Sequence, residues 1–102
     1  MPETPAPDLA LDLLATAKAH ARVDHDDDDT GLALMLKTAI AEIEGAANIT
    51  IADDLAEVPH DLVFAICDQA ARLYDLRGAE DGAQGLSLAA SRIVARYRGI
   101  AI

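Results

Sequence analysis

Hydrophobic residues recur along most of the chain at the three- and four-residue spacing of amphipathic helices. Four segments carry this pattern, over residues 8–23, 30–47, 59–77 and 86–98. No long segment shows the alternation of a half-buried strand, so the sequence predicts an all-α fold, a small bundle of four helices with short loops. The clearest apolar stripe, in the second segment, consists of Leu32, Met35, Leu36, Ala39, Ile40, Ile43 and Ala47.

Proline and glycine residues mark the ends of these helices. Pro59 suits the start of the third helix, and Gly78 and Gly99 are placed to end the third and the fourth. Between the second and third helices, we expect Asp53 or Asp54 to cap a turn.

The flanking segments differ from the helical part. Three prolines in MPETPAPD predict a flexible arm over residues 1–7. Gly99 is followed by three apolar or small residues, which predict a C-terminal tail over residues 99–102. The expected organisation is therefore one helical domain over residues 8–98 between an arm and a tail.

Alanine dominates the apolar composition. The chain has 22 Ala against 28 residues of Leu, Ile, Val, Met and Phe, and alanine adds little buried area to a core. A thin core in 102 residues makes association with other subunits an expected source of stability. The single Cys67 excludes an internal disulfide and is interpreted as a packing residue.

The formal net charge of −10 excludes a protein that grips nucleic acid through clustered lysines and arginines, although DNA could still pass by it. No apolar run is long enough for a membrane span. The N-terminal residues lack the basic and apolar regions of a signal peptide, so we expect a soluble protein that is made inside the cell.

The stretch VDHDDDDTG, residues 23–31, is the most unusual feature of the sequence. A calcium loop of the EF-hand type needs a Glu at its twelfth position. Counting from Asp26 places Lys37 there, and counting from Asp24 places Met35 there, so both registers fail. Asp26-x-Asp28-x-Thr30 matches a phosphotransferase nucleophile motif, but that chemistry needs a buried parallel strand, which the preceding helical residues exclude.

The remaining interpretation of this run is structural. One or two of these aspartates should cap the second helix and stabilise its positive end. Four consecutive carboxylates exceed what capping needs, so a solvated or channel-facing position is expected for Asp26, Asp27, Asp28 and Asp29. His20 and Asp24 have the spacing of a surface pair on a helix. No catalytic pair is evident, because His60 and Cys67 lie two turns apart.

Three blocks of sequence, in order, resemble the head–tail connector proteins of long-tailed phages, also called adaptor or head-completion proteins. The first is AKAHARVDHDDDDTGLALMLKTAIAEIEGAANI, a Lys-Ala-His pattern followed by an acidic run and a helix. The second is VPHDLVFAICDQAARLYDLRG, a proline-led helix that ends in Tyr74 and Arg77. The third is LAASRIVARYRGI, a closing helix with Tyr97 and Arg98 at its end, and the resemblance covers roughly residues 8–100.

The resemblance implies a structural virion protein of a phage, prophage or gene transfer agent, with no catalysis and no cofactor. It implies a homo-oligomeric ring beneath the portal protein, made in the host cytoplasm and located at the neck of the virion. Such a ring extends the channel through which double-stranded DNA passes and offers a platform to the next head-completion or tail protein.

Two surfaces are candidates for these contacts. Asp26 to Asp29 would face the DNA channel or the rim of the ring. The end of the fourth helix would dock on the portal or a neighbouring subunit through Arg96, Tyr97, Arg98, Ile100 and Ile102. The main alternative from another class is a small helical adaptor that binds a partner helix through an exposed groove, and a phosphatase or calcium protein is a more distant one.

Overall fold

The computed structural model describes residues 6–76 and 85–100, with the backbone alone described for residues 99 and 100. Four α-helices follow one another: α1 (Leu9–Ala21), α2 (Asp29–Ala47), α3 (His60–Asp75) and α4 (Leu88–Ile100). A short 3-10 helix, η1 (Leu55–Glu57), lies between α2 and α3. The predicted all-α fold of four helices is confirmed, and the described residues contain no strand.

The first helix begins and ends one to two residues inside the predicted range. The Asp8 carboxylate accepts a hydrogen bond from the Leu11 backbone N–H at 3.3 Å, which caps α1. Arg22 then adopts the left-handed conformation with φ 61°, and the Val23 N–H donates to the Lys18 carbonyl at 2.8 Å. This arrangement closes the helix at Ala21, before the predicted Val23.

Local signals also set the other boundaries. Asn48, left-handed at φ 58°, ends α2, and Pro59 occupies the position just before α3. Asp54 accepts from the Ala56 N–H at 3.0 Å and so caps η1, as predicted for this turn. The Ser87 hydroxyl accepts from the Ala90 N–H at 3.1 Å, so α4 begins at Leu88 instead of Leu86.

The C-terminal part of α4 departs from the sequence prediction. The helix continues through Gly99 to Ile100, whereas an end at Arg98 was expected from the glycine. A glycine costs only about 1 kcal/mol in a helix, so it weakens a last turn without excluding it. Residues 1–5 of the predicted arm, Gly78 and residues 101–102 of the predicted tail lie outside the described residues.

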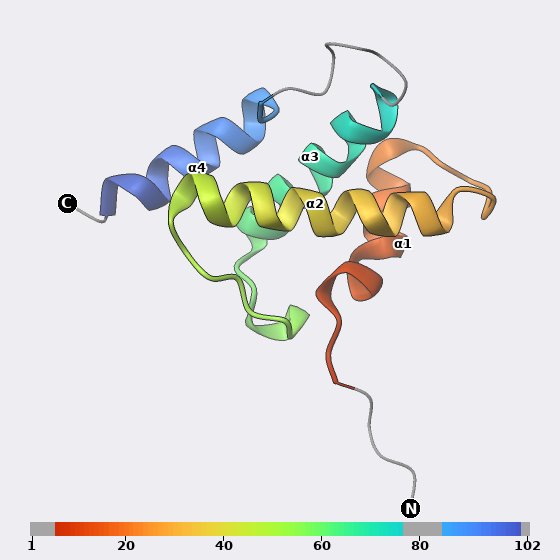
Figure 1. The fold of residues 1–102 in the computed structure, drawn as a ribbon, viewed down its shortest axis with the longest axis horizontal. Coiled ribbons are helices and arrows are strands. Elements are labelled where there is room, and N and C mark those ends of the chain that lie inside the picture. Colours follow the sequence, from red (N-terminus) through yellow and green to blue (C-terminus); the bar gives the residue numbers. More distant parts are fainter. Residues whose placement is uncertain (1–5, 77–84, 101–102) are drawn as a thin grey trace, which may run out of the picture.

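The second and third helices form the centre of the bundle, because each of them packs against the other three helices. Figure 1 shows α2 crossing the molecule, with α1 beside the end that carries residue 29 and α4 beside the other end. The predicted apolar faces meet in one core, whose fully buried larger side chains are Leu13, Leu32, Leu36, Ile43, Ile66, Gln69 and Cys67. Alanines fill the remaining contacts, with Ala39, Ala65, Ala70 and Ala90 wholly inaccessible.

Within residues 6–76 and 85–100, no helix is long and apolar enough to cross a membrane.

Candidate functional site

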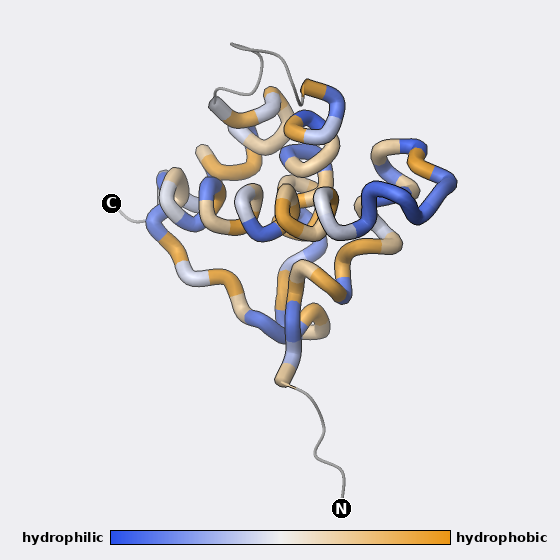
Figure 2. The backbone as a smooth tube through the Cα atoms, turned by 45° about the vertical axis from the view of Figure 1, so that its right-hand side comes forward, coloured by the Kyte–Doolittle hydropathy of each residue, from blue (hydrophilic) through white to orange (hydrophobic). Residues whose placement is uncertain are grey.

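The acidic run forms the bend between α1 and α2. Figure 2 shows this bend as a hydrophilic segment that stands out from the body of the molecule. Asp24, Asp26 and Asp27 are exposed, whereas Asp28 and Asp29 are half-buried. The four residues predicted as one surface therefore occupy two different environments.

Lys18 holds one side of the bend. Its ammonium group lies 2.5 Å from an Asp26 oxygen and 2.9 Å from an Asp29 oxygen. Hydrogen bonds to Asp26 and Asp29 raise the pKa of Lys18, and the hydrogen bond from Lys18 lowers the pKa of Asp26. The lysine thus offsets part of the mutual repulsion of the carboxylates at the start of α2.

Asp28 has a role that the sequence did not indicate. It occupies the position before α2, where one of the aspartates was expected to cap the helix, but its side chain makes no capping hydrogen bond. The carboxylate instead accepts a hydrogen bond from the Tyr74 hydroxyl at 2.6 Å. Because Tyr74 lies near the end of α3, this bond ties the acidic bend to the core helix.

His20 also pairs differently from the sequence prediction. Its Nε2 atom lies 2.9 Å from an Asp68 oxygen on α3, so the predicted pair with Asp24 is wrong. The left-handed Arg22 ends α1 before residue 24 can reach the helix face that carries His20. The imidazole ring also meets the edge of Phe64, with ring centroids 5.3 Å apart.

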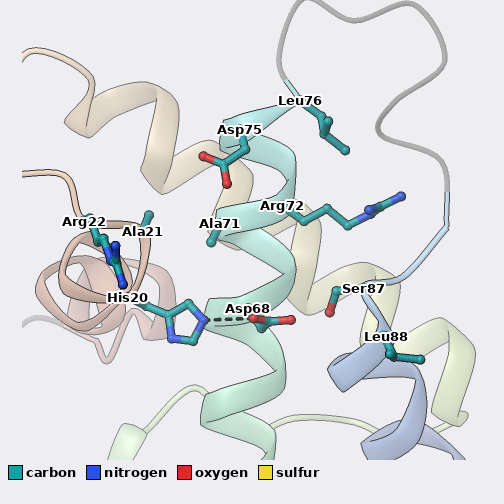
Figure 3. Close-up of a pocket in the computed structure, with 10 residues that line it drawn as sticks. All are labelled: His20, Ala21, Arg22, Asp68, Ala71, Arg72, Asp75, Leu76, Ser87 and Leu88. Atoms are coloured by element: carbon teal, nitrogen blue, oxygen red, sulfur yellow. Dashed lines mark hydrogen bonds and ion pairs between the residues drawn. The ribbon is translucent and has the colours of Figure 1, made fainter.

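The His20–Asp68 pair borders a hollow of about 490 Å³ between the end of α1, α3 and the start of α4. Figure 3 shows His20 pointing toward Asp68, with Ser87 on the far side of the carboxylate. Partial burial raises the pKa of Asp68, but hydrogen bonds from Ser87 and His20 and the His20 charge outweigh it, so the pKa is lowered. Asp68 therefore stabilises the fold above its ordinary pKa of 3.8, and this contribution is lost as the pH falls further.

Ser87, which lines this hollow, has a structural role. The Ser87 hydroxyl accepts the Ala90 N–H as a helix cap, and both signs of charge line the walls. Cys67 is buried, and burial raises the pKa of its thiol to about 11, which opposes a nucleophilic role and agrees with packing. The described part of the chain holds no group of three or more His, Cys, Asp or Glu placed to bind a metal ion.

The predicted docking residues at the end of α4 differ in their exposure. Tyr97 is half-buried, and its hydroxyl donates to Asp61 on α3 at 2.6 Å. Burial and this hydrogen bond raise the pKa of Tyr97 to about 12. Arg96 and Arg98 are exposed, while the Ile100 side chain and all of Ile102 lie outside the described residues.

Gln69 is a buried polar residue that the periodic pattern did not single out. Its amide nitrogen donates to Glu42 at 3.1 Å and to the Gly85 carbonyl at 3.2 Å. Its amide oxygen accepts the Ser87 backbone N–H at 2.7 Å. The sequence did contain a signal for this role, because Gln69 is a lone polar residue between Ile66 and Ala70 on the apolar face of the third helix.

A family model described as phage gp6-like head-tail connector protein matches residues 12–100 of this chain. The match extends from the first turn of α1 to the end of α4. No curated protein and no solved structure matches the chain significantly. The family-level resemblance drawn from the three sequence blocks is therefore confirmed.

Proposed function

Because this chain belongs to the phage gp6-like family of head–tail connector proteins, we propose that copies of it form a ring beneath the portal. The ring extends the DNA channel and provides the attachment platform for the next neck or tail protein. The family is one of structural phage connectors, which makes the chain a virion component. The observation that carries the proposal is the match over all four helices.

Three features of the molecule support this role. The core relies heavily on alanine, which suits a subunit that neighbours help to stabilise. The net charge of −10 suits a conduit, because passing DNA is repelled instead of held. The exposed arginines and isoleucine-containing end of α4 suit a contact with another protein.

Portal binding is assigned to the end of α4 and the residues after it. Deleting residues 99–102 removes two isoleucines, which could contribute roughly 3–6 kcal/mol to a contact before ordering costs. We expect the shortened chain to melt within a few degrees of the full chain but to bind portal at least about tenfold more weakly. Co-sedimentation with portal particles measures the binding.

A chain that lacks residues 2–5 is the control, and it should bind portal normally. Normal binding after deletion of 99–102 would move the portal contact elsewhere on the subunit. A much lower melting temperature would instead place the tail in the subunit's own core. A full chain that never joins portal particles would refute the connector proposal for this protein.

The exposed part of the acidic run is proposed to face the passing DNA. Asp26 and Asp27 are exposed at the bend, and their charge would keep phosphates from adhering. Replacing both by Lys should leave particle assembly intact but create phosphate contacts, each of which adds about one unit to the salt dependence of DNA binding. The resulting phage should package or eject DNA poorly.

Reversal of Asp53 and Glu57, two exposed acids far along the chain from the bend, changes the net charge equally and serves as the control. Infectivity that is normal in the Asp26→Lys, Asp27→Lys variant would show that the run is only a solvated helix start.

A further inference from the structure

Three leucines are strongly exposed on this small domain. Leu11 on α1, Leu34 on α2 and Leu88 on α4 have 58%, 64% and 68% of their surface accessible. Scattered exposed apolar residues are ordinary in a monomer. Two of these leucines, however, line the same groove, and the third begins an exposed helix face that carries arginines.

The groove lies between α1 and the first half of α2, with a volume of about 450 Å³. Leu11, Leu14, Ala33 and Leu34 make most of its lining apolar. Gly31 keeps one wall open, since a side chain built there would meet no atom within 4 Å. The groove can therefore accept an apolar side chain from outside without rearrangement of the helices.

Charged residues of both signs stand at this groove. Asp29 lies in its wall, and the exposed Asp12 follows Leu11 on α1. Lys37 is the one basic residue among those that line it. Asp29 is half-buried and paired with Lys18, so Asp12 is the exposed one of these two carboxylates. An occupant that places an arginine beside an apolar side chain would match the apolar lining and Asp12.

The outer face of α4 has this composition. Over Leu88–Ile100 the sequence contains three arginines and neither Asp nor Glu, in a chain of net charge −10. Leu88, Arg92 and Arg96 are exposed and lie four residues apart, so they form one stripe on the helix. Arg96 keeps 65% of its side chain accessible despite its 3.7 Å contact with Asp61.

The dimensions of the two surfaces also agree. Eight residues separate Leu88 from Arg96, which corresponds to about 12 Å along a helix. The part of α2 that lines the groove, Thr30 to Lys37, spans about 10 Å by the same measure.

We propose that α4 of one copy seats on the α1–α2 groove of the next copy, with Leu88 inserted between Leu11 and Leu34. Arg92 or Arg96 then reaches the exposed Asp12 beside Leu11. This contact rests on the proposed ring function. It specifies the two faces through which adjacent subunits of that ring meet.

The two faces belong to different parts of the subunit. Residues 29–37 of α2 line the groove, and Figure 1 shows α4 beside the opposite end of α2. A contact between unlike faces leaves one free face on each outer copy, so it propagates and closes into a ring where the rotation allows.

The test uses two full-length variants, Leu34→Asp in the groove and Leu88→Asp on the stripe. Both positions are exposed, so each variant should retain the helical circular dichroism and melting temperature of the unaltered chain. Each alone should be monomeric by analytical ultracentrifugation at concentrations where the unaltered chain associates. An equimolar mixture should form heterodimers and stop there, because each variant retains one intact face. Phe64→Asp, at an exposed apolar residue outside the contact, should associate as the unaltered chain does.

Cysteine pairing gives a second, independent measurement. Mixed Leu34→Cys and Leu88→Cys chains should form a disulfide-linked heterodimer on mild oxidation, at least tenfold faster than Leu34→Cys mixed with Thr50→Cys. The native Cys67 does not compete, because it is only 1% accessible.

Mixed aspartate variants that remain monomeric while the unaltered chain assembles would overturn the proposed contact, as would an unaltered chain that stays monomeric at every concentration. Equal cross-linking of the two cysteine mixtures would overturn it as well. Portal co-sedimentation separates this result from the function itself: portal binding by the monomeric Leu88→Asp variant leaves the connector role in place whatever happens to the subunit contact.

Discussion

Replacing Gln69 by Leu should lower the free energy of unfolding by about 2–4 kcal/mol, although leucine has nearly the same volume and is more hydrophobic. The glutamine is wholly buried, and its amide satisfies the Ser87 N–H, the Gly85 carbonyl and the Glu42 carboxylate. Leucine would leave these groups without that partner. The Ser87 N–H matters most, because it is buried at the residue that caps α4.

Thermal and urea unfolding followed by circular dichroism would measure this effect. In a domain of this size the expected loss corresponds to a melting temperature roughly 10–25 °C lower. Ser91→Ala, on the exposed side of α4, should change the stability by less than about 0.5 kcal/mol. An unchanged melting temperature in Gln69→Leu would mean that water can replace the amide and that α4 does not depend on it.

Replacing Leu36 by Ala should destabilise the fold by about 2–5 kcal/mol. Leu36 is wholly inaccessible on α2, so its truncation would leave a cavity in the core. Leu34 provides a matched control two residues away on the same helix, with 64% of its surface exposed. The same truncation there should cost less than about 0.5 kcal/mol.

Denaturant titration of the two variants tests where the core lies. Because a small domain is stable by only about 5–15 kcal/mol in total, Leu36→Ala could leave a substantial unfolded population at physiological temperature. Similar stabilities for the two variants would contradict the burial pattern of α2. A larger loss for Leu34→Ala in assembled rings than in monomers would be consistent with the subunit contact proposed at that residue.

Local pattern was sufficient for the helices and for much of the core. The stripe of residues 32–47 reappears as the buried face of α2, with Leu32, Leu36 and Ile43 almost wholly inaccessible. Asp8, Asn48 and Pro59 act at helix ends through their own backbone preferences, which do not depend on the rest of the fold. The family resemblance was readable for the same reason, because its three blocks follow the helices in order.

The candidate surfaces depended on contacts between distant residues. One or two aspartates of the run were expected to cap α2. Asp28, at the position before the helix, instead accepts a hydrogen bond from Tyr74, which lies 46 residues away and is brought to it by the packing of α3. His20 turns to Asp68 instead of Asp24 for the same reason. Glu44, which has no role in the periodic pattern, accepts the Ile51 N–H at 2.7 Å and holds the connection that leads to η1.

The sequence by itself determined the helical class, the number of helices, the apolar faces they bury and the family to which the chain belongs, because periodicity, end signals and motif order are properties of neighbouring residues. Only the tertiary structure decided which carboxylates remain free at the acidic bend, which polar residue supports α4, and which leucines stay outside the core. Those outcomes depend on how far each helix is rotated and shifted against its neighbours, and that geometry comes from packing all four helices together.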